Sequence, residues 1–311
     1  MAARSAYTRG RRERRARRKA GAMQLGIVGL GRMGAAMRER LRRGGHDVTG
    51  YDLDAEVSDV ATVQALVDGL EAPRVVWLMA PAGDATEGLV ENLAGLLGPG
   101  DILVDGGNSL YKDSIRRGEM LAGRGVRFLD AGVSGGIWGL DNGFCIMVGG
   151  DRDAFDVVEP AIATLAPEDG YLHVGPSGAG HYVKMVHNGI EYGLMQAYAE
   201  GFELLGAYDE DLDLHAIAEL WQHGSVVRSW LLELAGRALA EDPGLDRLQP
   251  YVEDSGEGRW TAIEAVERGV PAGVITGSLF ARFASRDERS FGLRMLAALR
   301  QQFGGHAVRE A

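Results

Sequence analysis

Short apolar runs that alternate with helix-length segments constrain the fold of this 311-residue chain more than any other feature. Alternation of this kind is typical of βαβ units and a largely parallel sheet. We therefore expect an α/β first half, with a helix over residues 151–165. The expected strands cover residues 24–28, 47–51, 75–79, 102–105, 127–130, 144–148 and 171–174.

The second half of the chain has a different periodicity. Beyond Gly180, apolar residues recur at steps of three and four over residues 183–205, 221–238 and 293–303, which is the period of an amphipathic helix. No segment there reads as a strand. The sequence therefore predicts an all-helical C-terminal domain, joined to the α/β domain by a hinge at residues 174–180.

Composition excludes several classes of protein. A single cysteine, Cys145, rules out a disulfide framework and a cysteine-based zinc site, and we expect it to be a small core residue of a buried strand. No apolar run approaches the roughly 18 residues of a membrane span, so we expect a soluble, cytoplasmic protein that does not engage membranes. The net charge of −11 argues against a nucleic-acid partner. Residues 1–22 hold nine Lys and Arg against one acid, and we interpret them as a basic disordered leader.

The segment GLGRMG at residues 29–34 stands between the first expected strand and a helix. In such a loop Gly29 permits a tight turn, Gly31 lets the backbone approach a pyrophosphate, and Gly34 lets helix and strand pack closely. The helix N-terminus then offers N–H groups to the phosphates. We predict a dinucleotide site in a Rossmann-type doubly wound parallel sheet. Its loop is Gly29, Leu30, Gly31, Arg32, Met33 and Gly34.

Asp52 follows the second expected strand, 18 residues beyond Gly34. A carboxylate at that place accepts hydrogen bonds from the adenosine ribose and repels a 2′-phosphate. No Lys or Arg occurs between Arg43 and Arg74, which also favours NAD over NADP. NADP stays possible because Arg32 could reach a 2′-phosphate.

Four polar residues in the first C-terminal helix share one face. Lys184, His187, Asn188 and Glu191 lie three, one and three residues apart, and residues three or four apart are neighbours on a helix. Lys184 and Glu191 are about 10 Å apart along the axis, so their side chains could hold a small molecule. A solvated helix face is the alternative. Gly189 costs the helix about 1 kcal/mol, which indicates that something approaches its backbone closely.

Taken together, these motifs resemble the decarboxylating 6-phosphogluconate dehydrogenases, in the short form of that family within the β-hydroxyacid dehydrogenases. The similarity covers nearly all of residues 23–311. It rests on GLGRMG (29–34), DGGNS (105–109), GVSGG (132–136), GAGHYVKMVHNGIEYG (178–193), FAR (280–282) and RQQFGGH (300–306), in that order.

The resemblance implies a reaction. Hydride leaves C3 of 6-phosphogluconate for NAD while Lys184 takes the C3 hydroxyl proton, which requires a lysine with a lowered pKa. The β-keto acid then loses carbon dioxide, and Glu191 protonates C1 of the enediol to give ribulose 5-phosphate. The resemblance implies no metal, and the scattered histidines suggest none.

The resemblance also implies a substrate shell and an assembly. Arg300 and His306 come from a neighbouring subunit in that family, so we expect a homodimer or tetramer in which they complete the adjacent site. The expected domains are a dinucleotide-binding domain over residues 23–178 and a substrate and dimerisation domain over residues 179–311. Substrate ligands would be Asn108 (also near the cofactor), Ser134, Gly135, Gly136, His187, Asn188, Tyr192, Arg282, Arg300 and His306.

One segment departs from the long-form pattern. Ser255 stands where the family usually has a lysine and Glu257 where it has a threonine, so we expect this loop to sit differently or contribute little to phosphate binding, with Arg259 compensating. Two other functions stay open. One is a non-decarboxylating dehydrogenase of the 3-hydroxyisobutyrate or tartronate-semialdehyde type. The other is a non-catalytic cofactor sensor, which would have little use for Lys184 and Glu191 together.

Overall fold

The computed structural model describes residues 21–287, 289–304, 307 and 309, so the expected leader falls almost wholly outside the described residues. The chain forms two compact units, one up to His187 and one from Asn188 onward. The expected domain boundary between residues 178 and 179 stays a prediction.

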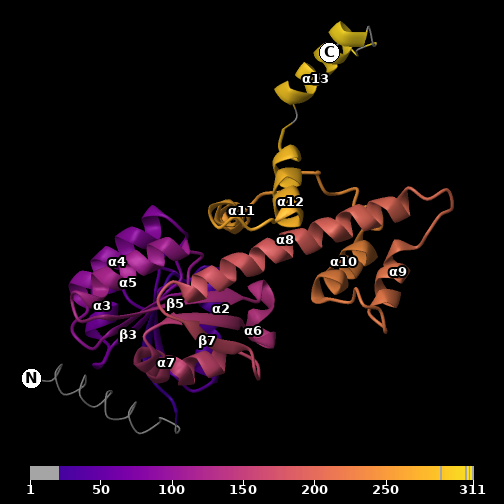
Figure 1. Ribbon diagram of the computed structural model, residues 1–311. Coiled ribbons are helices and arrows are strands. Elements are labelled where there is room, and N and C mark those ends of the chain that lie inside the picture. Colours follow the sequence, from indigo (N-terminus) through magenta and orange to yellow (C-terminus); the bar gives the residue numbers. More distant parts are fainter. Residues whose placement is uncertain (1–20, 288, 305–306, 308, 310–311) are drawn as a thin grey trace, which may run out of the picture. The chain divides into compact units, whose positions relative to one another are not determined.

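The first unit is built around a sheet with helices packed against it (Figure 1). The sheet has seven strands in the order β2-β1-β3-β4-β5-β6-β7. All neighbouring strands are parallel except β5 and β6, which confirms the expected α/β fold class. The chain turns from β2 back across β1 to β3, and open sheets bind ligands at the carboxyl ends beside such a switch. The strands are β1 (Gln24–Val28), β2 (Asp47–Tyr51), β3 (Val75–Leu78), β4 (Ile102–Asp105), β5 (Arg127–Ser134), β6 (Cys145–Gly150) and β7 (Tyr171–Gly175).

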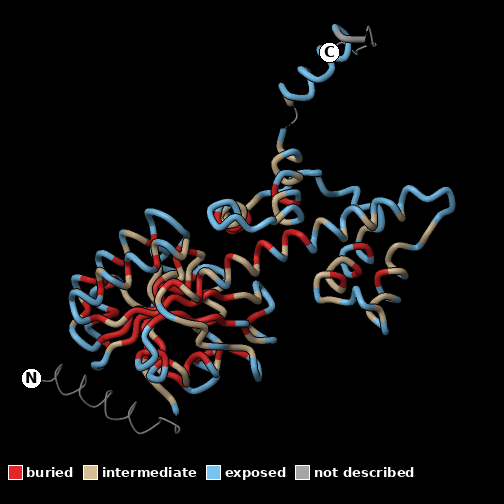
Figure 2. Tube along the Cα trace, in the orientation of Figure 1, coloured by how far each residue is buried: buried red, intermediate tan, exposed pale blue. Residues whose placement is uncertain are grey.

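Helices cover both faces of this sheet, and its central strands β1, β3, β4, β5 and β6 are buried over most of their length (Figure 2). One apolar core contains Met37 and Leu41 of α2 (Arg32–Arg43) and Phe155 of α7 (Arg152–Leu165). The other contains residues of α3 (Val63–Asp68), α4 (Asp84–Leu96) and α5 (Tyr111–Ala122). Between β5 and β6 lie a 3₁₀ turn, η1 (Gly136–Trp138), and α6 (Gly139–Asn142).

The expected strands agree with the structure except around β5 and β6. β5 runs on to Ser134 because its second half pairs antiparallel with β6, from Leu129 opposite Gly150 to Ser134 opposite Cys145. The expectation of a buried Cys145 is wrong, because that side chain is exposed. Successive strand residues face opposite sides. Ile146 belongs to the apolar core that contains α2 and α7, so Cys145 points to the opposite face of the sheet. At this end of β6 that face is exposed.

Helices are the only regular secondary structure among the described residues of the second unit, as expected. Its small core contains Ala218, Leu232 and Leu239, with Phe202 and Trp221 packed against it. In the described part of the chain no helix has the length and apolar character needed to cross a membrane. α8 (Ala179–Gly206) begins in the first unit and continues into the second. The remaining helices are α9 (Leu214–Trp221), α10 (Trp230–Glu241), α11 (Glu257–Glu267), α12 (Gly273–Ala284) and α13 (Phe291–Gly304).

Candidate cofactor and substrate sites

The glycine-rich loop after β1 has the geometry that a pyrophosphate requires. Gly29 has φ +95°, and a Cβ there would lie 2.3 Å from the Met79 carbonyl oxygen. A Cβ on Gly34 would lie 2.0 Å from the Gly29 carbonyl oxygen, so only glycine lets α2 approach the loop this closely. Gly31, the N-cap residue of α2, has no side chain with which to cap the helix, and open space lies where its Cβ would be. That N-terminus is therefore suited to an anion.

Asp52, just beyond β2, is joined to this loop. Its Oδ2 accepts a hydrogen bond from the Leu30 N–H at 2.5 Å, and its Oδ1 accepts one from the Asp54 N–H at 3.0 Å. These backbone bonds, first that of Asp54 and then that of Leu30, lower the pKa of Asp52. A carboxylate has about four acceptor positions, so Asp52 can hold the loop and still accept from ribose hydroxyls. The loop and Asp52 together fit a bound dinucleotide.

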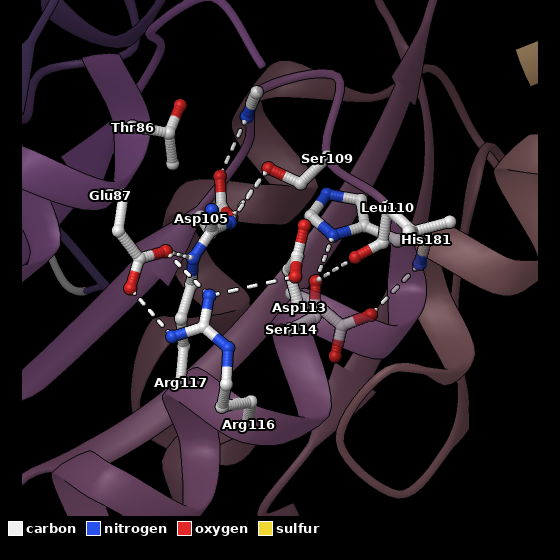
Figure 3. Close-up of polar contacts among 12 residues, drawn as sticks. Thr86, Glu87, Asp105, Ser109, Leu110, Asp113, Ser114, Arg116, Arg117 and His181 are labelled. Carbon is white, nitrogen blue, oxygen red and sulfur yellow. Dashed lines mark hydrogen bonds and ion pairs between the residues drawn. The ribbon is translucent and has the colours of Figure 1, made fainter. Parts of the chain in front are cut away.

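A buried ion pair between Asp105 and Arg117 holds the loop that carries Asn108 (Figure 3). Asp105, at the end of β4, is fully buried, and its Oδ2 accepts hydrogen bonds from Ser109 Oγ at 2.8 Å and Arg117 Nη1 at 3.0 Å. Arg117 Nε also donates to Glu87 Oε2 of α4 at 3.0 Å. The sequence did not reveal Arg117 as this anchor, because nothing local to the DGGNS motif points to α5.

Asp130 of β5 caps the first turn of α8. Its Oδ1 accepts a hydrogen bond from the Gly178 N–H at 2.7 Å, and its Oδ2 accepts one from the His181 N–H at 2.8 Å. Helix N-termini leave such N–H groups without intrahelical partners, and a carboxylate is stabilised there. Burial raises the pKa of Asp130, and its hydrogen bonds to the two N–H groups oppose that shift. His181 Nδ1 lies 2.7 Å from Ser114 Oγ, which adds a second attachment (Figure 3).

Lys184 lies one turn beyond this cap, where α8 touches the sheet directly. A Cβ on Gly132 of β5 would lie 2.4 Å from Lys184 Cβ. A Cβ on Gly180 would lie 2.4 Å from the Asp130 carbonyl oxygen. The absence of a side chain at Gly132, the first glycine of the GVSGG motif, therefore leaves the space that Lys184 occupies. Beyond Ser134, at the end of β5, the chain turns through Gly135 and Gly136, whose φ values of +138° and +53° favour glycine.

In the second unit, two expected phosphate ligands meet. The Arg282 guanidinium carbon lies 3.6 Å from the centre of the Tyr192 ring, and Arg282 Nη1 donates to the Glu253 carbonyl oxygen at 2.8 Å. The Tyr192 hydroxyl accepts a hydrogen bond from the Ser255 N–H at 3.0 Å. Ser255 thus holds Tyr192, although it lacks the charge of the lysine expected in the long form.

Two further arginines stand beside this pair. Arg259 donates two hydrogen bonds to Asp254, at 2.8 and 2.9 Å, and Arg286 Nη2 donates to Asp254 Oδ2 at 3.0 Å. The bonds from Arg259, followed by those from Arg286, hold the pKa of Asp254 at about 2. Sequence reasoning named Arg259 but missed Arg286, whose only signal was its position four residues after Arg282.

The polar face of α8 is not a simply solvated one. His187 and Glu191 are half-buried, and Asn188 is buried with its Nδ2 donating to Glu257 Oε1 at 2.6 Å. The close approach expected at Gly189 is confirmed, because a Cβ there would lie 2.7 Å from Thr261 Cγ2 of α11.

The last two expected ligands lie near the end of the chain. Arg300 is exposed on α13, and His306 lies outside the described residues. Among the described residues, no group of three or more His, Cys, Asp and Glu side chains could hold a metal ion.

A doubly wound sheet with a glycine-rich first turn and a carboxylate at the end of β2 defines a nicotinamide-dinucleotide-binding protein, and the anchored lysine of α8 adds the group that a hydroxyacid dehydrogenase needs. Two family models match the chain. The NAD binding domain of 6-phosphogluconate dehydrogenase matches residues 24–175, and the 6-phosphogluconate dehydrogenase C-terminal domain matches residues 180–302. The chain therefore belongs to the 6-phosphogluconate dehydrogenase family, which confirms the resemblance seen in its motifs.

Named relatives agree with this assignment. The chain is 45% identical over 297 residues to an NAD(+)-dependent, decarboxylating 6-phosphogluconate dehydrogenase of Haloferax volcanii, covering 92% of this chain and 98% of the relative. It is 35% identical to the decarboxylating enzyme of Bacillus licheniformis, covering 88% of this chain and 64% of that longer protein. The solved 6-phosphogluconate dehydrogenase of Plasmodium falciparum superposes with a TM-score of 0.78 at 29% identity, covering 93% of this chain and 66% of that one.

The buried ion pair between Asp105 and Arg117 should contribute to the stability of the folded chain. Arg117→Leu leaves the Asp105 carboxylate buried without its cation, and we expect a loss of about 3–5 kcal/mol in the free energy of unfolding. Arg116→Leu is the matched control, because Arg116 is a half-exposed neighbour that also pairs with Glu87; it should cost less than about 1 kcal/mol. Chemical denaturation measures both. Equal losses in the two variants would contradict the anchoring role of Arg117.

Proposed function

We propose that the chain oxidises 6-phosphogluconate with NAD and releases carbon dioxide and ribulose 5-phosphate. The observation that carries this proposal is the placement of Lys184 and Glu191 on one helix whose first turn is fixed to the sheet by Asp130. Family membership and the activities for which the relatives are named support the same reaction. The carboxylate of Asp52 supports NAD over NADP.

The chain offers groups for each part of the cofactor. The N-terminus of α2 and the open position at Gly31 would hold the pyrophosphate, with Leu30, Arg32 and Met33 forming the rest of the loop, and Asp52 would hold the ribose. When bound, the nicotinamide supplies the hydride acceptor.

Lys184 and Glu191 divide the proton transfers. Lys184 removes the proton of the C3 hydroxyl as that carbon is oxidised to a ketone. The resulting ammonium polarises the ketone, so that the electrons of the breaking bond to the carboxylate move toward the ketone oxygen and carbon dioxide leaves. Glu191 then delivers a proton to C1 of the enediol, which gives ribulose 5-phosphate.

The remaining groups would bind and orient the substrate. Tyr192 and Arg282 would take the phosphate, since a guanidinium forms strong charge-assisted pairs with phosphate oxygens. The hydroxyl and carboxyl groups would be held by Asn108, Ser134, Gly135, Gly136, His187 and Asn188.

A direct assay tests the reaction and the role of the lysine. With purified protein, NAD and 6-phosphogluconate, we expect reduced cofactor and carbon dioxide in equal amounts. Lys184→Met should lower turnover at least about 100-fold, because it removes the general base, while the affinity for NAD measured by calorimetry stays unchanged. Lys112→Met, at an exposed lysine of α5, is the control and should keep wild-type turnover.

The other outcomes of that assay distinguish between the alternative functions and test the role of Lys184. Cofactor reduction without carbon dioxide would identify a non-decarboxylating hydroxyacid dehydrogenase. No reduction of either NAD or NADP would contradict the proposed function. An active Lys184→Met enzyme would contradict the assignment of the base.

We also propose a homodimer in which Arg300 and His306 complete the neighbouring site. Support comes from α13, the helix that carries Arg300, because a single chain leaves a set of its apolar side chains exposed. Exposed apolar patches of this kind are typical of protein interfaces. The exposed apolar residues of α13 are Phe291, Leu293, Met295, Leu296 and Leu299.

Mixing two inactive variants tests this assembly. A dimer of one Arg300→Ala chain and one Lys184→Met chain contains one site with both an intact lysine and an intact arginine. We therefore expect up to half of the wild-type activity per dimer, against near-zero activity of each parent. Mixed dimers, verified by mass spectrometry, that show no such recovery would contradict site sharing.

A further inference from the structure

Glu257 is a buried acid that the reaction described above does not use. It is the first residue of α11 and only 3% exposed. Its Oε1 accepts a hydrogen bond from Asn188 Nδ2 at 2.6 Å, whereas its Oε2 is buried with no hydrogen-bond partner among the described residues. A buried acceptor without a partner costs about 1–3 kcal/mol.

The packing around Glu257 fixes it against α8. A Cβ on Gly258 would lie 2.4 Å from Tyr192 Cε2, and a Cβ on Gly189 would lie 2.7 Å from Thr261 Cγ2. The two glycines therefore let α11 contact α8 along the segment that holds Asn188 and Tyr192. Thr261 Oγ1 donates to the Glu257 carbonyl oxygen at 2.7 Å and steadies this turn. Glu257 is thus part of a tightly packed helix contact.

The chemistry of a carboxylate fixes the orientation of the Asn188 side chain. A carboxamide can present either its NH₂ or its oxygen to most polar neighbours, but an ionised carboxylate only accepts hydrogen bonds. Asn188 must therefore turn Nδ2 toward Glu257 and Oδ1 away from it. The threonine that the long-form pattern has at this position would accept or donate, and would select neither orientation.

Charge also separates the two ends of the substrate. A carboxylate repels a phosphate, and Glu257 is held next to Asn188, whereas Arg282 stacks on Tyr192. Hydroxyl groups of the substrate therefore suit the position beside Asn188 and Glu257, and its phosphate suits the position beside Tyr192 and Arg282.

We propose that Glu257 is a positioning and specificity-determining residue. It directs Asn188 Oδ1 to accept a hydrogen bond from a hydroxyl group of the sugar acid. This inference rests on the proposed function, because it concerns the substrate of the same site. Glu257 acts through Asn188, and its effect therefore requires the Asn188 carboxamide.

A double-mutant cycle on the full-length enzyme tests this role. Glu257→Gln keeps the shape of the side chain but allows both carboxamide orientations, and we expect KM for 6-phosphogluconate to rise about tenfold while KM for NAD stays unchanged. In the Asn188→Ala background, the same substitution should change KM less than about twofold. Glu264→Gln is the matched control, because Glu264 is buried on the same helix but pairs with Arg268, and it should leave both KM values unchanged.

The alternatives give different results. Equal fold-changes in KM in the two backgrounds, or an unchanged KM in Glu257→Gln, would overturn the positioning role. If Glu257→Gln fails to fold, Glu257→Thr serves in the same cycle with the same expectations. A wild-type enzyme that does not oxidise 6-phosphogluconate would contradict the proposed function itself. An active wild type with an additive cycle would contradict only the role of Glu257.

Discussion

The contact between the first turn of α8 and the sheet is the interaction on which the rest of the site depends. Asp130 accepts hydrogen bonds from the N–H groups of Gly178 and His181, and Gly132 and Gly180 let the backbones meet. Because Lys184 stands one turn further along the same helix, this contact determines where the lysine lies. Any side chain at Gly132 would collide with Lys184 Cβ, so the GVSGG motif contributes to the site through the absence of a side chain.

In the second unit the arginines and the buried acid Glu257 have different partners. Arg259 and Arg286 both bind Asp254, and Arg282 lies over the Tyr192 ring beside them. Glu257 instead pairs with the neutral Asn188, which lies one turn before Tyr192 on α8. An anionic sugar acid has a phosphate at one end and hydroxyl groups along its length, and this arrangement suits it. The departure from the long-form pattern at Glu257 thus replaces a small hydroxyl residue with an acid that has its own partner.

Local patterns predicted much of the fold and the cofactor loop. Glycine spacing at Gly29 to Gly34 and the carboxylate at Asp52 are short-range features, and the structure has the close contacts at Gly29 and Gly34 that such a loop requires. The anchors could not be predicted in this way. Arg117 binds Asp105 from another element, and Asn188 binds Glu257 across 69 residues of sequence. Such pairs depend on tertiary packing. Cys145 was misplaced because an apolar run does not tell which end of a strand stays uncovered on one face.

In the proposed reaction Lys184 and Glu191 carry out different proton transfers, and the configuration at C1 of the product reveals whether a fixed donor delivers the second proton. When 6-phosphogluconate is turned over in D₂O, nuclear magnetic resonance of the ribulose 5-phosphate should show one deuterium at C1 in a single configuration. In Glu191→Gln, solvent would supply that deuterium without a fixed donor, so both configurations should appear. A Glu191→Gln product with the same single configuration as the wild type would show that Glu191 does not donate this proton.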